Sequence, residues 1–139
     1  MDAGKPCAWS KSVECIRRVG NRQQGDSMVQ LLRAADRAPG RSRTVRFEGA
    51  EFGTDISFFS VDNDPGQGPG LHMHPYPETW IVKSGRARVV AGNEQFEVGP
   101  NDIAVVPAGV PHKFTNIGED RLVMFCVHAA GTMVQDNLE

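Results

Sequence analysis

Between Thr44 and His128 the chain divides into short strand-like segments, separated at nearly regular intervals by turn-forming residues. The chain has 15 Gly and 9 Pro, and pairs such as Ser84-Gly85 mark several of these turns. Short segments with such boundaries are typical of antiparallel sandwiches and barrels. The predicted strands are 44–47, 54–62, 78–83, 86–90, 94–98, 103–106, 112–116 and 121–128. The sequence therefore predicts an all-β fold, an antiparallel jelly-roll β-barrel, with no helix after residue 40.

The part before these strands is patterned differently. A length of 139 residues suits one domain. Residues 1–28 are predicted to form a short, mobile, basic N-terminal extension, with at most a helical turn around residues 13–19. Residues 29–139 are predicted to form the domain, with its core at 44–130. The pattern at 29–38 fits a helix or an edge strand, and its periodicity does not decide between them.

Charge and hydropathy exclude two classes of partner. Residues 1–46 carry ten Lys/Arg against four Asp/Glu, whereas the remainder carries five against thirteen. A basic segment can contact nucleic acid, but no aromatic residues alternate with these arginines, so we expect no such partner. The longest apolar run, residues 122–127, is too short to cross a bilayer, and no apolar segment led by basic residues opens the chain. We expect a cytoplasmic protein without a membrane partner.

Three of the four histidines and one glutamate fall in two short clusters. His72 and His74 are separated by one residue in an extended stretch, so their side chains point to the same face. Pro75 and Pro77 end this stretch, because proline cannot donate to a central ladder. The next strand begins at Glu78, which can direct its carboxylate toward the two imidazoles.

The second cluster adds His112, which follows a turn shaped by Pro107 and Gly109. Three imidazoles and one carboxylate on rigid strands suit one divalent transition metal ion, namely Mn, Fe, Co, Ni, Cu or Zn, and not Ca or Mg. The predicted metal ligands are His72, His74, Glu78 and His112. On a six-coordinate ion these ligands leave positions for water, substrate or dioxygen.

These two clusters give the sequence its resemblance to a small single-domain cupin of the conserved-barrel type. The first family motif, G(X)5HXH(X)3-4E(X)6G, matches Gly66, His72, His74, Glu78 and Gly85. The second, G(X)5PXG(X)2H(X)3N, matches Pro107, Gly109, His112 and Asn116, with Asn101 in place of the leading glycine. Asparagine tolerates a left-handed backbone better than most residues, so we expect the turn at Asn101 to be retained. The resemblance covers roughly residues 44–130 and implies a β-barrel, commonly dimeric, with the metal on the four matched ligands.

Residues on the same strand faces as the ligands are expected to line a pocket. Trp80 shares the inward face of Glu78, and Phe114 shares that of His112. Either Phe58 or Phe59 adds another wall, and we assign Phe58. The remaining pocket candidates are Tyr76, in the Pro-Tyr-Pro turn at the expected mouth, and His128, which ends the last strand.

The predicted function is that of a metal-dependent enzyme acting on a small organic molecule. The ion would act as a Lewis acid, and Glu78 would double as a proton acceptor on leaving the ion. By the resemblance, an oxygenase is the leading class, followed by an isomerase and a hydrolase. The alternative is a non-catalytic, metal-bound binding or sensor protein. Because residues 122–127 lack polar alternation, we expect a homodimer partner or the N-terminal segment to cover the last strand.

Overall fold

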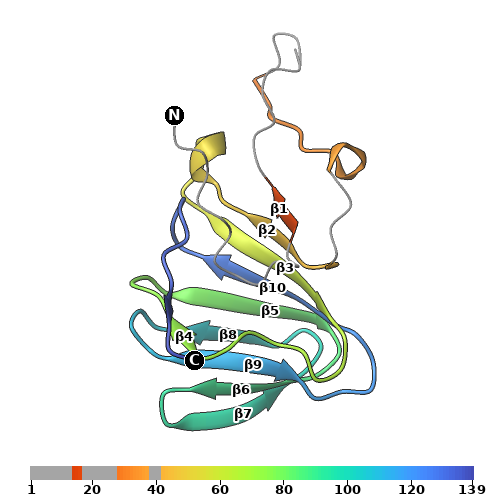
Figure 1. Ribbon diagram of the computed structural model, residues 1–139, viewed down its shortest axis with the longest axis vertical. Helices are drawn as coiled ribbons and strands as arrows, with labels where there is room; N and C mark the ends of the chain where they lie inside the picture. The colour runs from red at the N-terminus through yellow and green to blue at the C-terminus, as the bar shows by residue number, and fades with distance from the viewer. Residues whose placement is uncertain (1–13, 17–27, 38–41) are drawn as a thin grey trace.

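Two largely antiparallel sheets face each other in the computed structural model, which describes residues 14–16, 28–37 and 42–139 (Figure 1). The first sheet has the spatial order β1 (Glu14–Ile16), β2 (Val45–Phe47), β3 (Ser57–Asn63), β10 (Leu122–His128), β5 (Glu78–Ser84) and β8 (Ile103–Val106). The second has the order β11 (Asp136–Asn137), β4 (His72–Met73), β9 (His112–Asn116), β6 (Ala87–Ala91) and β7 (Glu94–Val98). This arrangement confirms the predicted antiparallel β-barrel.

All eight predicted strands are present, and their ends lie close to the predicted ones. The largest difference is at β3, which begins at Ser57 and not at residue 54. Before β3 the chain makes a single 3-10 turn, η2 (Ala50–Phe52), which ends at Gly53 with a left-handed φ of 75°. The predicted turn at Asn101 is also confirmed, since this residue has a φ of 69°.

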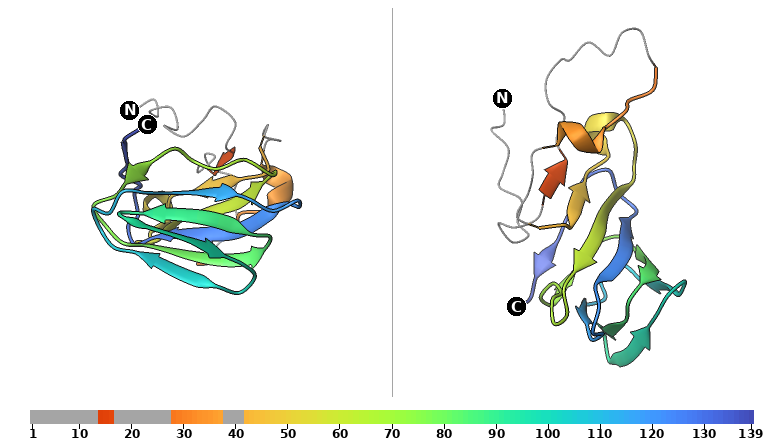
Figure 2. Two further views of the ribbon diagram at one scale, coloured as in Figure 1. Left: turned by 90° about the horizontal axis from the view of Figure 1, so that it is seen from below. Right: turned by 90° about the vertical axis from the view of Figure 1, so that its right-hand side faces the viewer.

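Two local expectations for the N-terminal part, the helical turn and the helix or edge strand, are wrong where the structure describes the chain. Residues 14–16 form β1, which pairs in parallel with β2, and do not form a helical turn. Residues 28–37 form neither a longer helix nor a strand, and contain only the 3-10 turn η1 (Ala34–Asp36). They lie outside the two sheets, where Gln30 donates a hydrogen bond to the carbonyl of Phe52 in η2 (Figure 2). Residues 1–13, 17–27 and 38–41, which include most of the predicted extension, lie outside the described residues.

The core fills the space between the sheets because each strand turns alternate residues inward. On β10 the inward residues Leu122, Met124 and Cys126 are buried, and His128 continues the same face. Cross-strand pairing places His128 beside Ser57 of β3 and beside Glu78 of β5. A row of polar side chains therefore faces the interior where β5 begins and β10 ends.

The segment after β10, residues 129–139, is called the strap below. It leaves the first sheet and pairs through β11 with β4 of the second sheet (Figure 1). Leu138 N–H also donates to the carbonyl of Leu71. The strap thus connects the two sheets at the end of the barrel that carries His72. Within the described residues, no helix has the length and apolar character needed to span a membrane.

Candidate metal centre

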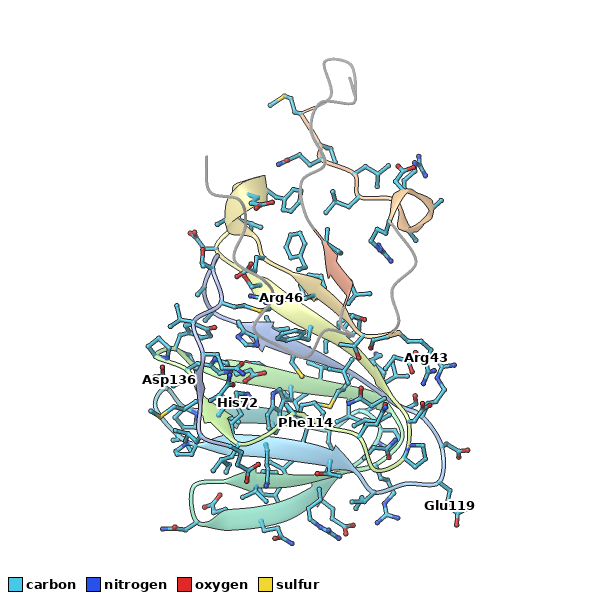
Figure 3. All side chains as sticks on the ribbon, viewed as in Figure 1. Arg43, Arg46, His72, Phe114, Glu119 and Asp136 are labelled. Atoms are coloured by element: carbon cyan, nitrogen blue, oxygen red, sulfur yellow. The ribbon has the colours of Figure 1, made fainter. Side chains whose placement is uncertain are left out.

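The four predicted metal ligands converge between the sheets. One ligand atom from each of His72, His74, Glu78 and His112 lies within 4.8 Å of the other three, and each residue is at most 3% exposed. His72 on β4 pairs directly with His112 on β9, and His74 follows β4. Glu78 opens β5 in the opposite sheet. Figure 3 shows His72 at the end of the barrel where β4 meets the strap.

Each of the three histidines is oriented by a backbone carbonyl. The contacts join Nδ1 of His72 to Gly70 O at 2.7 Å, Nδ1 of His112 to Val110 O at 2.7 Å, and Nδ1 of His74 to Val134 O at 2.8 Å. Because a carbonyl oxygen only accepts hydrogen bonds, each Nδ1 carries a proton. In each neutral ring the lone pair is therefore on Nε2, which is the arrangement that a metal-binding histidine requires.

The Nε2 atoms of His112, His74 and His128 approach the carboxylate of Glu78. Oε2 of Glu78 lies 2.8 Å from Nε2 of His112 and 3.1 Å from Nε2 of His74. Oε1 lies 3.2 Å from Nε2 of His128. Burial raises the pKa of Glu78, but the hydrogen bonds that His112, His128 and His74 donate in their protonated form outweigh it and hold this pKa well below its ordinary value. Glu78 is thus an ionised carboxylate at 3% exposure.

A divalent transition metal ion fits this donor set. A buried anion needs compensating positive charge, which either protonated imidazoles or a cation can supply. Nε2 of His74 is buried and has no hydrogen-bond partner among the described residues. Burial lowers the pKa of His72 to about 4, which keeps this ring neutral near pH 7, as a ligand must be. The four residues can therefore hold a metal ion.

The sequence comparison agrees with this geometry. A family model described as a cupin domain matches residues 59–128, which include most of β3, all four candidate ligands and β10. The chain belongs to the cupin family. Over 61 residues this cupin is 39% identical to an uncharacterised protein of Streptomyces coelicolor, a match that covers 44% of the chain and 58% of the relative. The chain thus spans less than two thirds of that relative.

Solved structures give the same fold. Bacillus subtilis oxalate decarboxylase, studied for its Mn(II) centres, superposes with a TM-score of 0.59 at 26% identity, covering 63% of this cupin and 25% of that chain. An uncharacterised protein from Klebsiella pneumoniae with a double-stranded β-helix domain superposes with a TM-score of 0.57 at 30% identity. That match covers 61% of this cupin and 76% of the Klebsiella chain.

The aromatic residues near the ligands fall into two layers. The ring centroid of Trp80 lies 5.6 Å from that of His112, in an edge-to-face arrangement. Phe114, labelled in Figure 3, packs edge-to-face on Trp80 at 5.4 Å, and no ring contact joins it to a ligand. Trp80 therefore borders the site, whereas Phe114 supports it from behind.

The assignment of Phe58 to the pocket is wrong. Phe59 points inward, is 3% exposed and lies 5.7 Å from the His128 ring. Phe58 stacks on Phe47 at 4.9 Å and contacts Phe125, on the outer face of the sheet. Successive residues of a strand point to opposite faces, so only one of the two adjacent phenylalanines can face the site.

Tyr76 and His128 lie closer to the ligands than their sequence positions suggest. The Tyr76 ring stacks on that of His74 with centroids 5.2 Å apart, and its hydroxyl lies 2.9 Å from Nδ1 of His128. His128 is fully buried at 0% exposure. Sequence reasoning did not find Val134 of the strap, because it contacts His74 only through its backbone, which leaves no side-chain signal.

Asn116, the last residue of the second motif, has a structural role. Its side-chain amide donates hydrogen bonds to the carbonyls of Asn63 and Asp120, and its Oδ1 accepts one from Gly118 N–H. These contacts hold together the turns after β3 and β9. Asn116 thus anchors the barrel end opposite the histidines.

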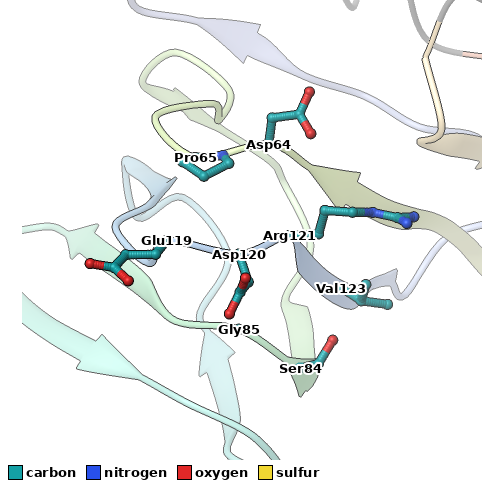
Figure 4. A pocket seen from close by; sticks show the side chains of 8 residues that line it. All are labelled: Asp64, Pro65, Ser84, Gly85, Glu119, Asp120, Arg121 and Val123. Atoms are coloured by element: carbon teal, nitrogen blue, oxygen red, sulfur yellow. The ribbon is translucent and has the colours of Figure 1, made fainter.

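An open surface pocket lies at that opposite end (Figure 4). It is formed by the turns after β3 and β5 and before β10, and includes Ser84 and Val123. Asp62, beside this pocket, pairs with Arg121 and Arg43, and these contacts lower the pKa of Asp62. The pocket is thus separate from the candidate metal centre.

Proposed function

We propose that this cupin is a metal-dependent enzyme that acts on a small organic molecule. One divalent transition metal ion would be held by His72, His74, Glu78 and His112. The observation that carries the proposal is that three histidines, each committed at Nδ1 to a carbonyl, surround one buried ionised carboxylate. Three nitrogens and one oxygen suit Fe, Mn, Ni, Cu or Zn. The Mn(II) centres of the structurally similar Bacillus enzyme support the proposal.

Within this class we propose an oxygenase-type reaction. A bound redox-active ion supplies Lewis acidity and electron transfer at the site. Glu78 is the proposed catalytic residue, because its ionised carboxylate lies within the site and could accept a proton on leaving the ion. Trp80 packs beside the ligand His112 and Phe59 packs beside His128, and this apolar surface would limit the access of water to the site.

The decisive experiment is elemental analysis of freshly purified protein, with His74→Ala as its matched variant. We expect near-stoichiometric Fe, Mn, Ni or Cu in the wild type and almost none in His74→Ala. Oxygen uptake with a panel of small oxidisable molecules then tests the reaction. Absence of metal even after reconstitution overturns the metal site. Zinc supports hydrolysis or isomerisation in place of oxygen chemistry, and ligand uptake without turnover supports the binding or sensor protein.

We propose that the partner in solution is a second copy of this chain, bound at the outer face of the first sheet. Ile103 and Val105 of β8 are 67% and 63% exposed, and Phe125 of β10 is exposed on the same face. The sequence predicts that this face of β10 is covered, and a dimer would bury these apolar side chains. Light scattering should give about 30 kDa, twice the chain mass of 15.2 kDa, and about 15 kDa for Val105→Glu. A wild-type mass of one chain overturns the dimer.

A further inference from the structure

A chain of polar contacts links the strap to the oxygen of Glu78 that faces away from His74 and His112. Val134 N–H donates to the Tyr76 hydroxyl at 3.0 Å, and this hydroxyl lies 2.9 Å from Nδ1 of His128. Nε2 of His128 then lies 3.2 Å from Oε1 of Glu78. These contacts therefore lead through Tyr76 and His128 to Oε1 of Glu78. The proposed metal site uses the other oxygen, Oε2.

The direction of the hydrogen bonds follows from the groups themselves. A backbone N–H only donates, so the Tyr76 oxygen accepts from Val134, and the Tyr76 proton is available to Nδ1 of His128. His128 then carries its own proton on Nε2, which lies 3.2 Å from Oε1 of Glu78. Nε2 is buried, and in the described part of the chain it makes this ion-pair contact with Glu78 but no hydrogen bond.

The same residue of the strap also orients a ligand. The Val134 carbonyl accepts from Nδ1 of His74, while its N–H donates to Tyr76, whose ring stacks on the His74 ring. Phe59 packs edge-to-face on His128 from the side of β3 and restricts the rotation of that ring. Tyr76 and His128 are therefore held by packing as well as by hydrogen bonds.

We propose that Tyr76 and His128 are positioning residues of the metal site, which hold Oε1 of Glu78 so that Oε2, beside His74 and His112, is the oxygen presented to the ion. This inference rests on the proposed metal site. It also assigns His128 a role other than that of a ligand, because an imidazole with its proton on Nε2 has no lone pair there. Partners that orient metal ligands in this way typically change affinity by about 10–100-fold when removed.

The test uses Co(II) as the probe and compares Tyr76→Phe, His128→Leu and His128→Gln with the wild type. Tyr76→Phe removes one oxygen and keeps the ring stacked on His74. The amide of His128→Gln can donate to Glu78 and accept from Tyr76, whereas His128→Leu can do neither. Val127→Ala, the adjacent residue on the outer face of β10, is the matched control. The readouts are the dissociation constant and the visible absorption spectrum of bound Co(II), which depends on coordination geometry.

We expect Tyr76→Phe and His128→Leu to weaken Co(II) binding about 10–100-fold and to change the spectrum. We expect the Co(II) affinity and the spectrum of His128→Gln to be closer to wild type than those of His128→Leu. Val127→Ala should change neither the affinity nor the spectrum. Wild-type affinity and spectrum in Tyr76→Phe overturn the inference, even where His128→Leu fails to fold. A wild-type protein that binds no Co(II) overturns the proposed metal site itself, so the two failures are distinguishable.

Discussion

His72 and His112 occupy directly paired positions on β4 and β9, with ring centroids 4.3 Å apart. Residues opposite each other in an antiparallel pair point to the same face, so this pairing brings together two histidines that are far apart in the sequence. Glu78 reaches the same place from the other sheet. The site therefore depends on the strand register, since a slip of one residue on β9 would turn His112 away from the interior.

Replacing His112 by alanine should abolish metal binding and leave the β-barrel intact. The substitution removes one of the three imidazoles and the 2.8 Å contact with Glu78, while the core residues of β9 remain. Elemental analysis should show almost no bound metal, with a far-UV circular dichroism spectrum like that of wild type. Thr115→Ala, on the opposite face of β9, should keep its metal. Full metal content in His112→Ala would contradict the assigned ligand set.

The metal-free protein should lose stability as the pH falls. The pKa of His72 is lowered from 6.5 to about 4, chiefly by burial, so between these values the unfolded chain binds a proton that the folded chain does not. The free energy of unfolding therefore falls as the pH decreases from 6.5 to 4. Glu78 acts in the same direction below its ordinary pKa of 4.5, since its folded-state pKa is lower still.

Urea denaturation of the metal-free protein at a series of pH values measures this effect. In His72→Gln, the free energy of unfolding should fall less steeply between pH 6.5 and 4 than in wild type, because the titrating ring is absent. Below pH 4.5 the free energy of unfolding should still fall in this variant, because Glu78 contributes to the change there. A stability that is constant or increases as the pH falls would contradict the assigned shifts.

The turn at Asn101 should discriminate between alanine and glycine. Asn101 is the one non-glycine residue with a positive φ in the described part of the chain, at 69°. A left-handed conformation costs most L-residues roughly 1–2 kcal/mol, and asparagine and glycine tolerate it better. Asn101→Ala should therefore lower the free energy of unfolding by about 1 kcal/mol, and Asn101→Gly should leave it within about 0.5 kcal/mol of wild type. Chemical denaturation measures both, and equal losses in the two variants would exclude backbone strain as the cause.

The features that the sequence predicts correctly are local ones. The ends of β7, β8 and β9 follow from turn residues and from the alternation of side chains, and these signals lie within a few residues of each strand. The convergence of the four candidate ligands follows from spacing within two short clusters together with the family resemblance. The turn at Asn101 was predictable because its conformation depends on one residue type.

The features that the sequence does not reveal depend on pairing between distant segments. Phe58 and Phe59 are adjacent and equally apolar, so only the register of β3 with β10 decides which one faces inward. The pairing of β1 with β2 joins residues that no local pattern connects. Val134 reaches His74 through its carbonyl, and any residue at position 134 would offer the same group.

Trp80 should report metal binding through its fluorescence. Its ring lies 5.6 Å from that of His112, so a paramagnetic ion at the proposed site should quench the indole. The chain has a second tryptophan, Trp9, and comparison of Trp9→Phe with Trp80→Phe separates the two signals. Quenching by Co(II) or Cu(II) should persist in Trp9→Phe and disappear in Trp80→Phe, whereas Zn(II), which is diamagnetic, should quench neither. The Trp80 N–H has no hydrogen-bond partner among the described residues, so Trp80→Phe removes no hydrogen bond to them. Quenching that survives in Trp80→Phe and is absent from Trp9→Phe would place the ion away from His112.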